Sequence, residues 1–394
     1  MAKPKIRFKG YTDDWEQRKL KEIADKVSEK NKNNEFSEPF TNSAEQGIIS
    51  QKDYFDREIV NDENLNGYYI VRNDDFIYNP RISVTAPVGP INRNRLGRNG
   101  VMSPLYTVFR THDIDNLYLE FYFKTTKWHR FMKLNGDSGA RFDRFTISST
   151  QFMEMPIPYP TLAEQRKMGA HFDSLDHLIT LHQRKCEEIK KLKKYMLQKM
   201  FPQNGQTVPE IRFAGFTDDW EQRKLGELYI ERNERGDNSL QILSVSIHSG
   251  VSDKELNADG LGKKVYRSKD KSTYKHVYAG DLIFNMMRAW QGAIGVARNE
   301  GMISPAYISA IPNEKVYPLF MNYLLRRRDV INQINNLSYG VTDFRKRLYW
   351  DSFIRVTCQF PSVAEQKKIT EFFDGLDHII TLHHRKYTST LKSS

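Results

Sequence analysis

The stretch that decides the fold is TLAEQRKMGAHFDSLDHLITLHQRKCEEIKKLKKYMLQKMF, residues 161–201. It follows Pro160 and contains no proline, and Thr161 with Glu164 has the S/T-x-x-E spacing of a capping box, which predicts two reciprocal backbone hydrogen bonds. Apolar or weakly polar residues recur at steps of three and four: Phe172, Leu175, Ile179, His182, Cys186, Ile189, Leu192, Met196 and Met200. This pattern predicts a helix of about 60 Å whose seam pairs with another helix.

A second copy of this helix occurs in the same chain. From Ser362 the sequence SVAEQKKITEFFDGLDHIITLHHRK matches the first copy at 15 of 25 positions, 201 residues further on. The second copy is predicted to be shorter, because its seam loses apolar residues after Tyr387 and Ser394 falls opposite Lys193. The candidate residues for partner contact or helix packing are Phe172, Leu175, Ile179, His182, Ile189, Leu192, Met196, Phe373, Leu376 and Ile380.

A second repeated block shows that the whole chain is a tandem duplication. Residues 6–20, IRFKGYTDDWEQRKL, agree with residues 211–225, IRFAGFTDDWEQRKL, at 13 of 15 positions. Between the repeated blocks lie short β-rich runs and helical stretches at 117–134 and 318–334, which predict a mixed α/β domain in each half. The expected parts are domain 6–160, helix 161–202, linker 203–210, domain 211–361 and helix 362–394, with the two globular domains separated by two long antiparallel helices that resemble a coiled coil.

Composition limits the class of protein. The 394 residues are 39% hydrophobic and 12% aromatic, enough for ordered cores, and no apolar run approaches the roughly 20 residues of a membrane span. Two cysteines provide neither a disulfide framework nor a metal quartet, and the N-terminus lacks the apolar segment of a secretion signal, so we expect the reduced cytoplasm. A net charge of +11 favours a polyanionic partner.

Basic loops provide the candidate DNA-binding residues. Residues 76–112 contain five arginines and no Asp or Glu, and residues 91–100, INRNRLGRNG, alternate Arg with Asn and Gly. Arginine binds guanine edges through two hydrogen bonds, whereas lysine clusters suit phosphates. A solvated loop is the alternative interpretation. The candidates are Arg81, Arg93, Arg95, Arg98, Arg141 and Arg144 in the first half, and Lys263, Lys264, Arg267, Arg345, Lys346 and Arg347 in the second.

Catalytic and metal motifs are missing from the sequence. It contains no G-x-x-x-x-G-K-[ST], no G-x-G-x-x-G and no H-E-x-x-H. His182 fits a packed or interface histidine better than a ligand, because His177 lies about 140° away around the helix. The repeated pairs Asp173/Asp176 and Asp374/Asp377 fit a polar helix face or partner contact better than acid–base catalysis, and Lys190 to Lys194 fit a solvated face.

With these blocks in place, the chain resembles the specificity subunit of type I restriction-modification systems. The resemblance lies in the RFxGFxDDWEQRKL-like blocks at Arg7 and Arg212, in the Pro-x-x-Ala-Glu-Gln helix starts at Pro160 and Pro361, and in the Phe-Asp-x-Leu-Asp continuations. It implies two target-recognition domains, each recognising one half of a bipartite, asymmetric site in double-stranded DNA. The long helices would set the distance between the half-sites.

The resemblance also implies partners. The helices would dock two modification (methyltransferase) subunits, which bind S-adenosylmethionine and methylate adenine, and ATP- and Mg-dependent restriction/translocase subunits would join them. The chain itself would be non-catalytic, bind no cofactor or metal and contact no membrane. Two alternatives stay open: a fused or stand-alone methyltransferase or endonuclease, which would bind S-adenosylmethionine itself, and a non-catalytic coiled-coil scaffold, which would bind no duplex.

Overall fold

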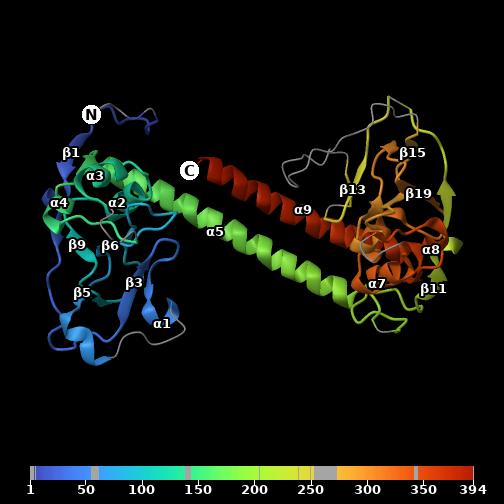
Figure 1. Cartoon of the computed structure of the whole chain (residues 1–394), viewed down its shortest axis with the longest axis horizontal. Helices are drawn as coiled ribbons and strands as arrows, with labels where there is room; N and C mark the ends of the chain where they lie inside the picture. The colour runs from blue at the N-terminus through green and yellow to red at the C-terminus, as the bar shows by residue number, and fades with distance from the viewer. Residues whose placement is uncertain are drawn as a thin grey trace. The chain divides into compact units, whose positions relative to one another are not determined.

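The computed structural model of the chain describes residues 4, 6–54, 62–137, 143–203, 205–237, 239–248, 250–252, 273–340 and 345–393. Contacts between residues divide the chain into two compact units. Unit 1 is residues 1–180 with 390–394, and unit 2 is residues 181–389. Figure 1 shows the ribbon, coloured from blue at the N-terminus to red at the C-terminus.

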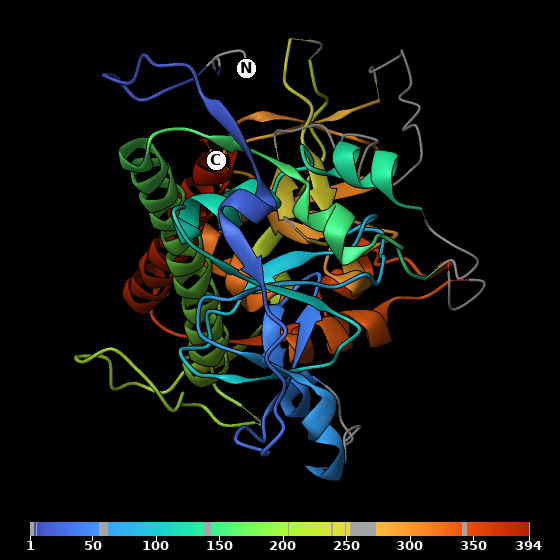
Figure 2. The ribbon, with the colours of Figure 1, turned by 90° about the vertical axis from the view of Figure 1, so that its left-hand side faces the viewer.

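Unit 1 is built mainly from strands. Its strands are β1 (Glu16–Lys19), β2 (Ala24–Lys26), β3 (Pro39–Ser43), β4 (Gly47–Ser50), β5 (Tyr69–Val71), β6 (Phe76–Tyr78), β7 (Ile91–Arg93), β8 (Gly100–Met102), β9 (Thr107–Thr111) and β10 (Pro156–Tyr159). Its helices are α1 (Gln51–Tyr54), α2 (Asn116–Phe123), α3 (His129–Asn135), α4 (Ser149–Met153) and the start of α5 (Leu162–Lys199). Figure 2 turns these strands, blue to green, toward the viewer.

Unit 2 has a similar series of elements. Its strands are β11 (Glu221–Lys224), β12 (Tyr229–Arg232), β13 (Ser244–Ser246), β14 (Gly250–Ser252), β15 (Lys275–Val277), β16 (Leu282–Asn285), β17 (Ile294–Val296), β18 (Gly301–Ile303), β19 (Tyr307–Pro312) and β20 (Thr357–Phe360). Its helices are α6 (Met321–Leu324), α7 (Arg328–Leu337), α8 (Trp350–Phe353), the end of α5, and α9 (Val363–Ser393) as far as residue 389.

The duplication extends to strand pairing. The central sheet of unit 1 has the order β2-β9-β6-β7, and that of unit 2 has the order β12-β19-β16-β17. In both units the strand at the end of the repeated opening block pairs antiparallel with the strand that precedes the long helix, β1 with β10 and β11 with β20. The predicted mixed α/β fold, with two sheet-rich domains and a long helix, is confirmed.

The two helical stretches predicted between the sheets are each interrupted. The stretch predicted at 117–134 forms α2 and α3 separately, and the Thr125 hydroxyl donates a 2.7 Å hydrogen bond to the Tyr122 carbonyl where α2 ends. Trp128 also donates its indole N–H to the Phe123 carbonyl at 3.0 Å. These side chains satisfy the last carbonyls of α2, so the chain turns there instead of continuing one helix.

The capping box predicted for the long helix is only half formed. The Glu164 backbone N–H donates to the Thr161 hydroxyl at 3.4 Å, as expected. The buried Glu164 carboxylate, however, accepts two hydrogen bonds from the Arg7 guanidinium, at 2.7 and 2.8 Å. A buried carboxylate is stabilised far more by a cation than by a backbone amide, which explains why the predicted reciprocal bond gives way.

Unit 2 repeats this arrangement. The Arg212 guanidinium donates to both oxygens of the buried Glu365 carboxylate, at 2.8 and 2.7 Å, and Glu365 N–H donates to the Ser362 hydroxyl at 3.3 Å. The two repeated sequence blocks therefore contact each other within each unit: the opening block holds the start of the long helix.

Within unit 2, the end of α5 runs antiparallel to α9. Nδ1 of His182 lies 3.0 Å from Nδ1 of His383, and the Lys193 ammonium lies 2.5 Å from the Asp377 carboxylate. Phe373 and Leu376 are buried in the core of unit 2, with Ile189 and Met196 packed against it.

One residue of the predicted seam does not face α9. Leu192 is 46% exposed, whereas the Lys193 side chain is 21% exposed and faces α9. The contact positions His182, Cys186, Ile189 and Lys193 follow steps of four, three and four, which stay on one face of a helix. Leu192 lies one residue off that face, and the predicted seam had needed two successive steps of three to include it. Lys193 is correspondingly not part of a solvated face.

Candidate nucleic-acid interface

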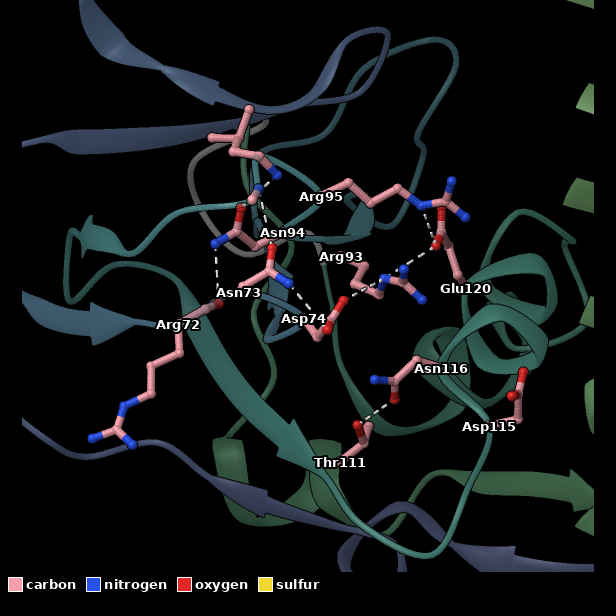
Figure 3. Close-up of polar contacts among 12 residues, drawn as sticks. Arg72, Asn73, Asp74, Arg93, Asn94, Arg95, Thr111, Asp115, Asn116 and Glu120 are labelled. Carbon is pink, nitrogen blue, oxygen red and sulfur yellow. Dashed lines mark hydrogen bonds and ion pairs between the residues drawn. The ribbon is translucent and has the colours of Figure 1, made fainter. Parts of the chain in front are cut away.

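The arginine-rich segment of unit 1 begins on β7, and its first candidate, Arg93, is enclosed (Figure 3). The Arg93 side chain is 14% exposed, and its Nε lies 3.2 Å from the Asp74 carboxylate and 3.5 Å from that of Glu120. Asn94, next in the chain, is buried and donates to the carbonyls of Arg72 and Arg98, both at 3.0 Å. Arg93 and Asn94 thus hold the loop in shape.

The next two candidate arginines also have carboxylate partners, although more of each side chain is exposed. Arg95 lies 2.8 Å from Glu120 and 3.0 Å from Asp173, and its side chain is 43% exposed. Arg98 donates two hydrogen bonds of 2.7 Å to Glu38. The Arg98 hydrogen bond lowers the pKa of the Glu38 carboxyl, against the opposing effect of burial. The segment has no acidic residue of its own, so elements distant in the sequence supply its counter-charges.

Arg81 and Arg144 form a different arrangement in unit 1. They face each other across an isolated antiparallel bridge, with hydrogen bonds from Ile82 N to Asp143 O at 3.0 Å and from Phe145 N to Pro80 O at 2.7 Å. Residues directly opposite in such a bridge have Cβ atoms about 5 Å apart. The Arg81 side chain is 68% exposed, and its ion pair with Asp143 is long, at 3.9 Å. Two arginine side chains that start this close together, one of them largely exposed, suit an anion such as phosphate.

The other candidates divide into described and undescribed residues. Arg345 and Arg347 are exposed and Lys346 is half-buried, beside a bridge in which Tyr339 and Arg347 exchange backbone hydrogen bonds of 3.1 and 2.9 Å. The remaining four candidates lie outside the described residues: Arg141, Lys263, Lys264 and Arg267.

Unit 2 contains a basic groove that the sequence did not predict. It has a volume of about 1100 Å³ and lies between the end of α5, α9, the α6–α7 segment and β17. Its lining includes two carboxylates, Asp329 and Asp377, against seven cationic side chains: Lys190, Lys193, Lys194, Arg298, Arg326, Arg327 and Arg328. This imbalance creates a positive potential in a concave surface, where field lines are focused.

The cations of this groove differ in how firmly they are held. Arg326 is fixed by hydrogen bonds to the carbonyls of Ile247 and His248, at 2.5 and 2.8 Å, and burial lowers its pKa. Lys193 and Arg327 are paired with the two carboxylates of the groove. Lys194 and Arg328 are exposed, and within the described residues we find no carboxylate bound to either. These two side chains are free to contact a polyanion.

The signal for this groove is present in the sequence but spread over two distant segments. Arg326, Arg327 and Arg328 form the only run of three successive arginines, and the lysines of residues 190–194 lie more than 130 positions earlier. Neither run alone indicates a site, because each fits a solvated surface. Only the packing of α5 against the α6–α7 segment brings them together.

Two other properties bear on the class of protein. Within the described residues, no cluster of three or more His, Cys, Asp or Glu side chains could hold a metal ion. Across the same part of the chain, no helix combines the length and the apolar character that crossing a membrane requires.

Comparison with known proteins connects these features to a family. The family model of the type I restriction modification DNA specificity domain matches residues 12–191. The type I restriction enzyme MjaVIII specificity subunit of Methanocaldococcus jannaschii is 21% identical over 372 residues, which cover 82% of this chain and 83% of that protein. This confirms the predicted resemblance to type I specificity subunits.

The fold of this chain is also similar to that of a solved specificity subunit. The crystal structure of the type I restriction-modification S subunit from M. genitalium has a TM-score of 0.56 and 12% identity to this chain, covering 99% of this chain and 96% of that one. Specificity subunits are in general the non-catalytic members of their complexes.

Proposed function

We propose that the chain is the DNA-recognition subunit of a type I restriction-modification complex and that it catalyses no reaction itself. Each unit recognises one half of a bipartite, asymmetric site in double-stranded DNA. The observation that carries this proposal is the duplication itself. The two units keep the same central sheet and the same helix-start contact, but differ in the surfaces where their cations gather.

The charges indicate how each unit would contact DNA. In unit 1, the exposed and weakly paired Arg81 and its neighbour Arg144 suit phosphates or guanine edges. In unit 2, the groove with Lys194 and Arg328 suits the sugar-phosphate backbone, because clustered cations release counterions when they bind it. Phosphate contacts would position each unit, and base contacts from nearby loops would give it specificity.

The α5–α9 pair of unit 2 is the proposed dock for the methyltransferase subunits. It carries large apolar side chains that are 40–46% exposed, namely Leu181, Leu192, Ile379 and Leu382. Such side chains on a helix surface suit a protein partner. S-adenosylmethionine, ATP and Mg would bind to the partner subunits, including the restriction/translocase subunits, and the complex would act in the cytoplasm, where the DNA is.

A charge reversal in the groove tests DNA binding. The double variant Lys194→Glu/Arg328→Glu should bind duplex DNA at least tenfold more weakly at low salt, and its plot of log affinity against log salt should be shallower by up to about two. Lys185→Glu/Lys191→Glu is the matched control, because it changes the net charge by the same amount and both lysines lie on α5 outside the lining of the groove. Equal losses in both variants would mean that net charge, not the groove, binds DNA.

Two further measurements separate the alternatives. Binding of S-adenosylmethionine to the chain alone would favour an enzyme, and failure to bind any duplex would favour a scaffold.

A further inference from the structure

One loop occupies the same place in both units, after the third strand in the order of the central sheet. It follows β6 in unit 1 and β16 in unit 2. Each loop starts with an asparagine whose side-chain oxygen accepts a hydrogen bond from the backbone N–H two residues later. Asn79 accepts it from Arg81 at 2.9 Å, and Asn285 accepts it from Met287 at 3.0 Å. Such a side-chain turn fixes the direction in which both loops leave the sheet.

Both loops also end alike, in a turn closed by a glycine. The backbone N–H of Gly89 donates to the Ala86 carbonyl at 3.0 Å, and that of Gly292 donates to the Ala289 carbonyl at 2.8 Å. Both glycines have a positive φ, +83° and +99°, which glycine adopts readily. Both alanines are buried. The two loops are therefore equivalent elements of the duplicated fold.

Between these fixed ends the loops differ in length and sequence but expose the same two kinds of side chain. Unit 1 has PRISVT at residues 80–85, and unit 2 has MMR at residues 286–288. Each loop exposes one arginine and one apolar side chain to solvent. These side chains are Arg81 and the fully exposed Val84 in unit 1, and Arg288 and Met287 in unit 2.

A second arginine flanks each loop from the segment before the last strand of the unit. The backbone N–H of Phe145 donates to the carbonyl of Pro80 at 2.7 Å, and that of Leu348 donates to the carbonyl of Met286 at 2.9 Å. Directly before each donor the chain has an arginine. These flanking arginines are Arg144 in unit 1 and Arg347 in unit 2.

The turn in the loop of unit 1 holds Val84 away from the core. Ser83 N–H donates to the Ala86 carbonyl at 3.1 Å, and Ala86 N–H donates to the Ser83 carbonyl at 3.2 Å and to its hydroxyl at 3.1 Å. Apolar side chains stabilise a fold by leaving water, so a fully exposed valine adds nothing to the stability of unit 1. A side chain fixed in this way suits an apolar group outside the chain, because little freedom is lost on binding.

DNA presents one such apolar group at its base edges, the C5-methyl group of thymine in the major groove. Arginines beside an apolar side chain suit the phosphates and guanine edges around it. We propose that Val84 and Met287 each contact the methyl group of a thymine in the half-site of their own unit. The arginines of each loop hold it in the major groove. This inference rests on the proposed DNA recognition and names the side chains that select a base.

Replacement of single thymines by deoxyuridine tests the contact, because it removes the methyl group and leaves base pairing unchanged. The probes are the duplexes that the full chain selects from a random pool, each with one thymine replaced. We expect at least one position in each half-site at which deoxyuridine weakens binding by about three- to fivefold. This is the effect of removing one methyl-sized group from an apolar contact.

Substitutions assign each effect to its side chain. Val84→Ser should bind the thymine and deoxyuridine duplexes equally at the position in one half-site, and Met287→Ser should do so only in the other. Val84→Thr keeps one methyl group and should keep part of the effect. Ile230→Ser is the matched control, because Ile230 is 72% exposed but pairs with Ile311, at the opposite end of β19 from the residue that pairs with Asn285. It should leave both effects unchanged.

The outcomes distinguish this contact from DNA recognition itself. Selection of no common sequence would contradict DNA recognition and, with it, the contact. Selection of a two-part site at which no deoxyuridine changes the affinity, or with a half-site that lacks thymine on both strands, would overturn the contact alone. A deoxyuridine effect that persists in either serine variant, or disappears in Ile230→Ser, would overturn it as well.

Discussion

Unit 1 and unit 2 hold the long helix by the same ion pair but surround the repeated tryptophan differently. The ion pairs Arg7–Glu164 and Arg212–Glu365 are alike. In each, a guanidinium donates two hydrogen bonds to a buried carboxylate. Trp220, however, is covered by Phe201, whereas its counterpart Trp15 is half-exposed. The duplication therefore preserved the residues that attach the helix and let the residues around the tryptophan diverge.

The repeated carboxylates on the two long helices are also conserved between the units, while their partners differ. Asp173 and Asp176 bind Arg95 and Lys124 in unit 1, at 3.0 and 2.9 Å. Their counterpart Asp374 accepts a 2.5 Å hydrogen bond from Tyr323 and lies 3.4 Å from Arg298. In both units the carboxylates connect the helix to its own globular part, but the groups that they bind have changed. Each carboxylate is thus engaged in ion pairs or hydrogen bonds within its own unit.

The largest expected effect is the loss of stability when Trp220, the tryptophan covered by Phe201, is replaced. Trp220→Ala should destabilise unit 2 by about 3–5 kcal/mol, because it leaves a cavity in a packed core. Trp15→Ala should cost unit 1 less than half as much, since its ring is already partly in solvent. Hydrogen exchange measured separately in the strands of each unit checks this. Equal losses would show that the surroundings of Trp15 are as filled as those of Trp220.

The next largest effect is the loss of stability when the arginine–glutamate ion pair that both units share is broken. Arg212→Ala leaves the buried Glu365 carboxylate without its cation and should destabilise unit 2 by about 3 kcal/mol. Arg7→Ala should act in the same direction on unit 1. Protection of the first turns of α5 and α9 against hydrogen exchange is the readout. The double variant Arg212→Ala/Glu365→Leu should recover part of the loss; if it does not, the ion pair is not the cause.

A third prediction separates two sets of arginines in unit 1. Arg81→Ala and Arg144→Ala should each weaken binding to all duplexes and reduce the salt slope by about one, as expected for a phosphate contact. The sequence prediction that Arg93, Arg95 or Arg98 recognises bases requires instead that one of their alanine variants relax specificity by roughly 1–3 kcal/mol in one half-site. Competition between duplexes distinguishes these outcomes, and unaltered discrimination in all three would exclude the 91–100 loop.

The smallest effect concerns the paired helices of unit 2. Burial, followed by the charges of His182, Lys386 and Lys185, lowers the pKa of His383. The unfolded chain therefore binds that proton more readily, and the α5–α9 contact should lose stability as the pH falls through about 6.5. Hydrogen exchange in residues 376–389 at pH 7.5 and 5.5 measures the change. His383→Gln should show a weaker pH dependence, and an unchanged dependence would assign it to another group.

The sequence was sufficient for the fold because the decisive signals are local and repeated. Helix periodicity and the opening block predicted the long helices and the duplicated α/β units. The heptad-like pattern failed at Leu192, because a step rule cannot distinguish it from the neighbouring Lys193, whose ammonium reaches Asp377. The capping box failed in part because its glutamate has a stronger partner 157 residues earlier in the chain.

The candidate DNA-binding site was harder to predict, because its residues and their ion-pair partners are far apart in the sequence. Counting charges within residues 76–112 suggested unpaired arginines, yet the fold supplies Glu38, Glu120 and Asp173 from elsewhere. The groove of unit 2 likewise combines two segments that are distant in the sequence. Ion pairs and grooves depend on tertiary contacts, which a single sequence considered alone does not reveal.

The central claim is that the chain recognises a specific DNA site in two parts. Selection of binding sequences from a random duplex pool by the full, folded chain tests it most directly. The account predicts enrichment of two short sequence blocks at a constant separation, with Arg81→Ala weakening recovery of all selected duplexes and Lys194→Glu/Arg328→Glu doing so more strongly. A selected pool indistinguishable in sequence from the starting pool would contradict it.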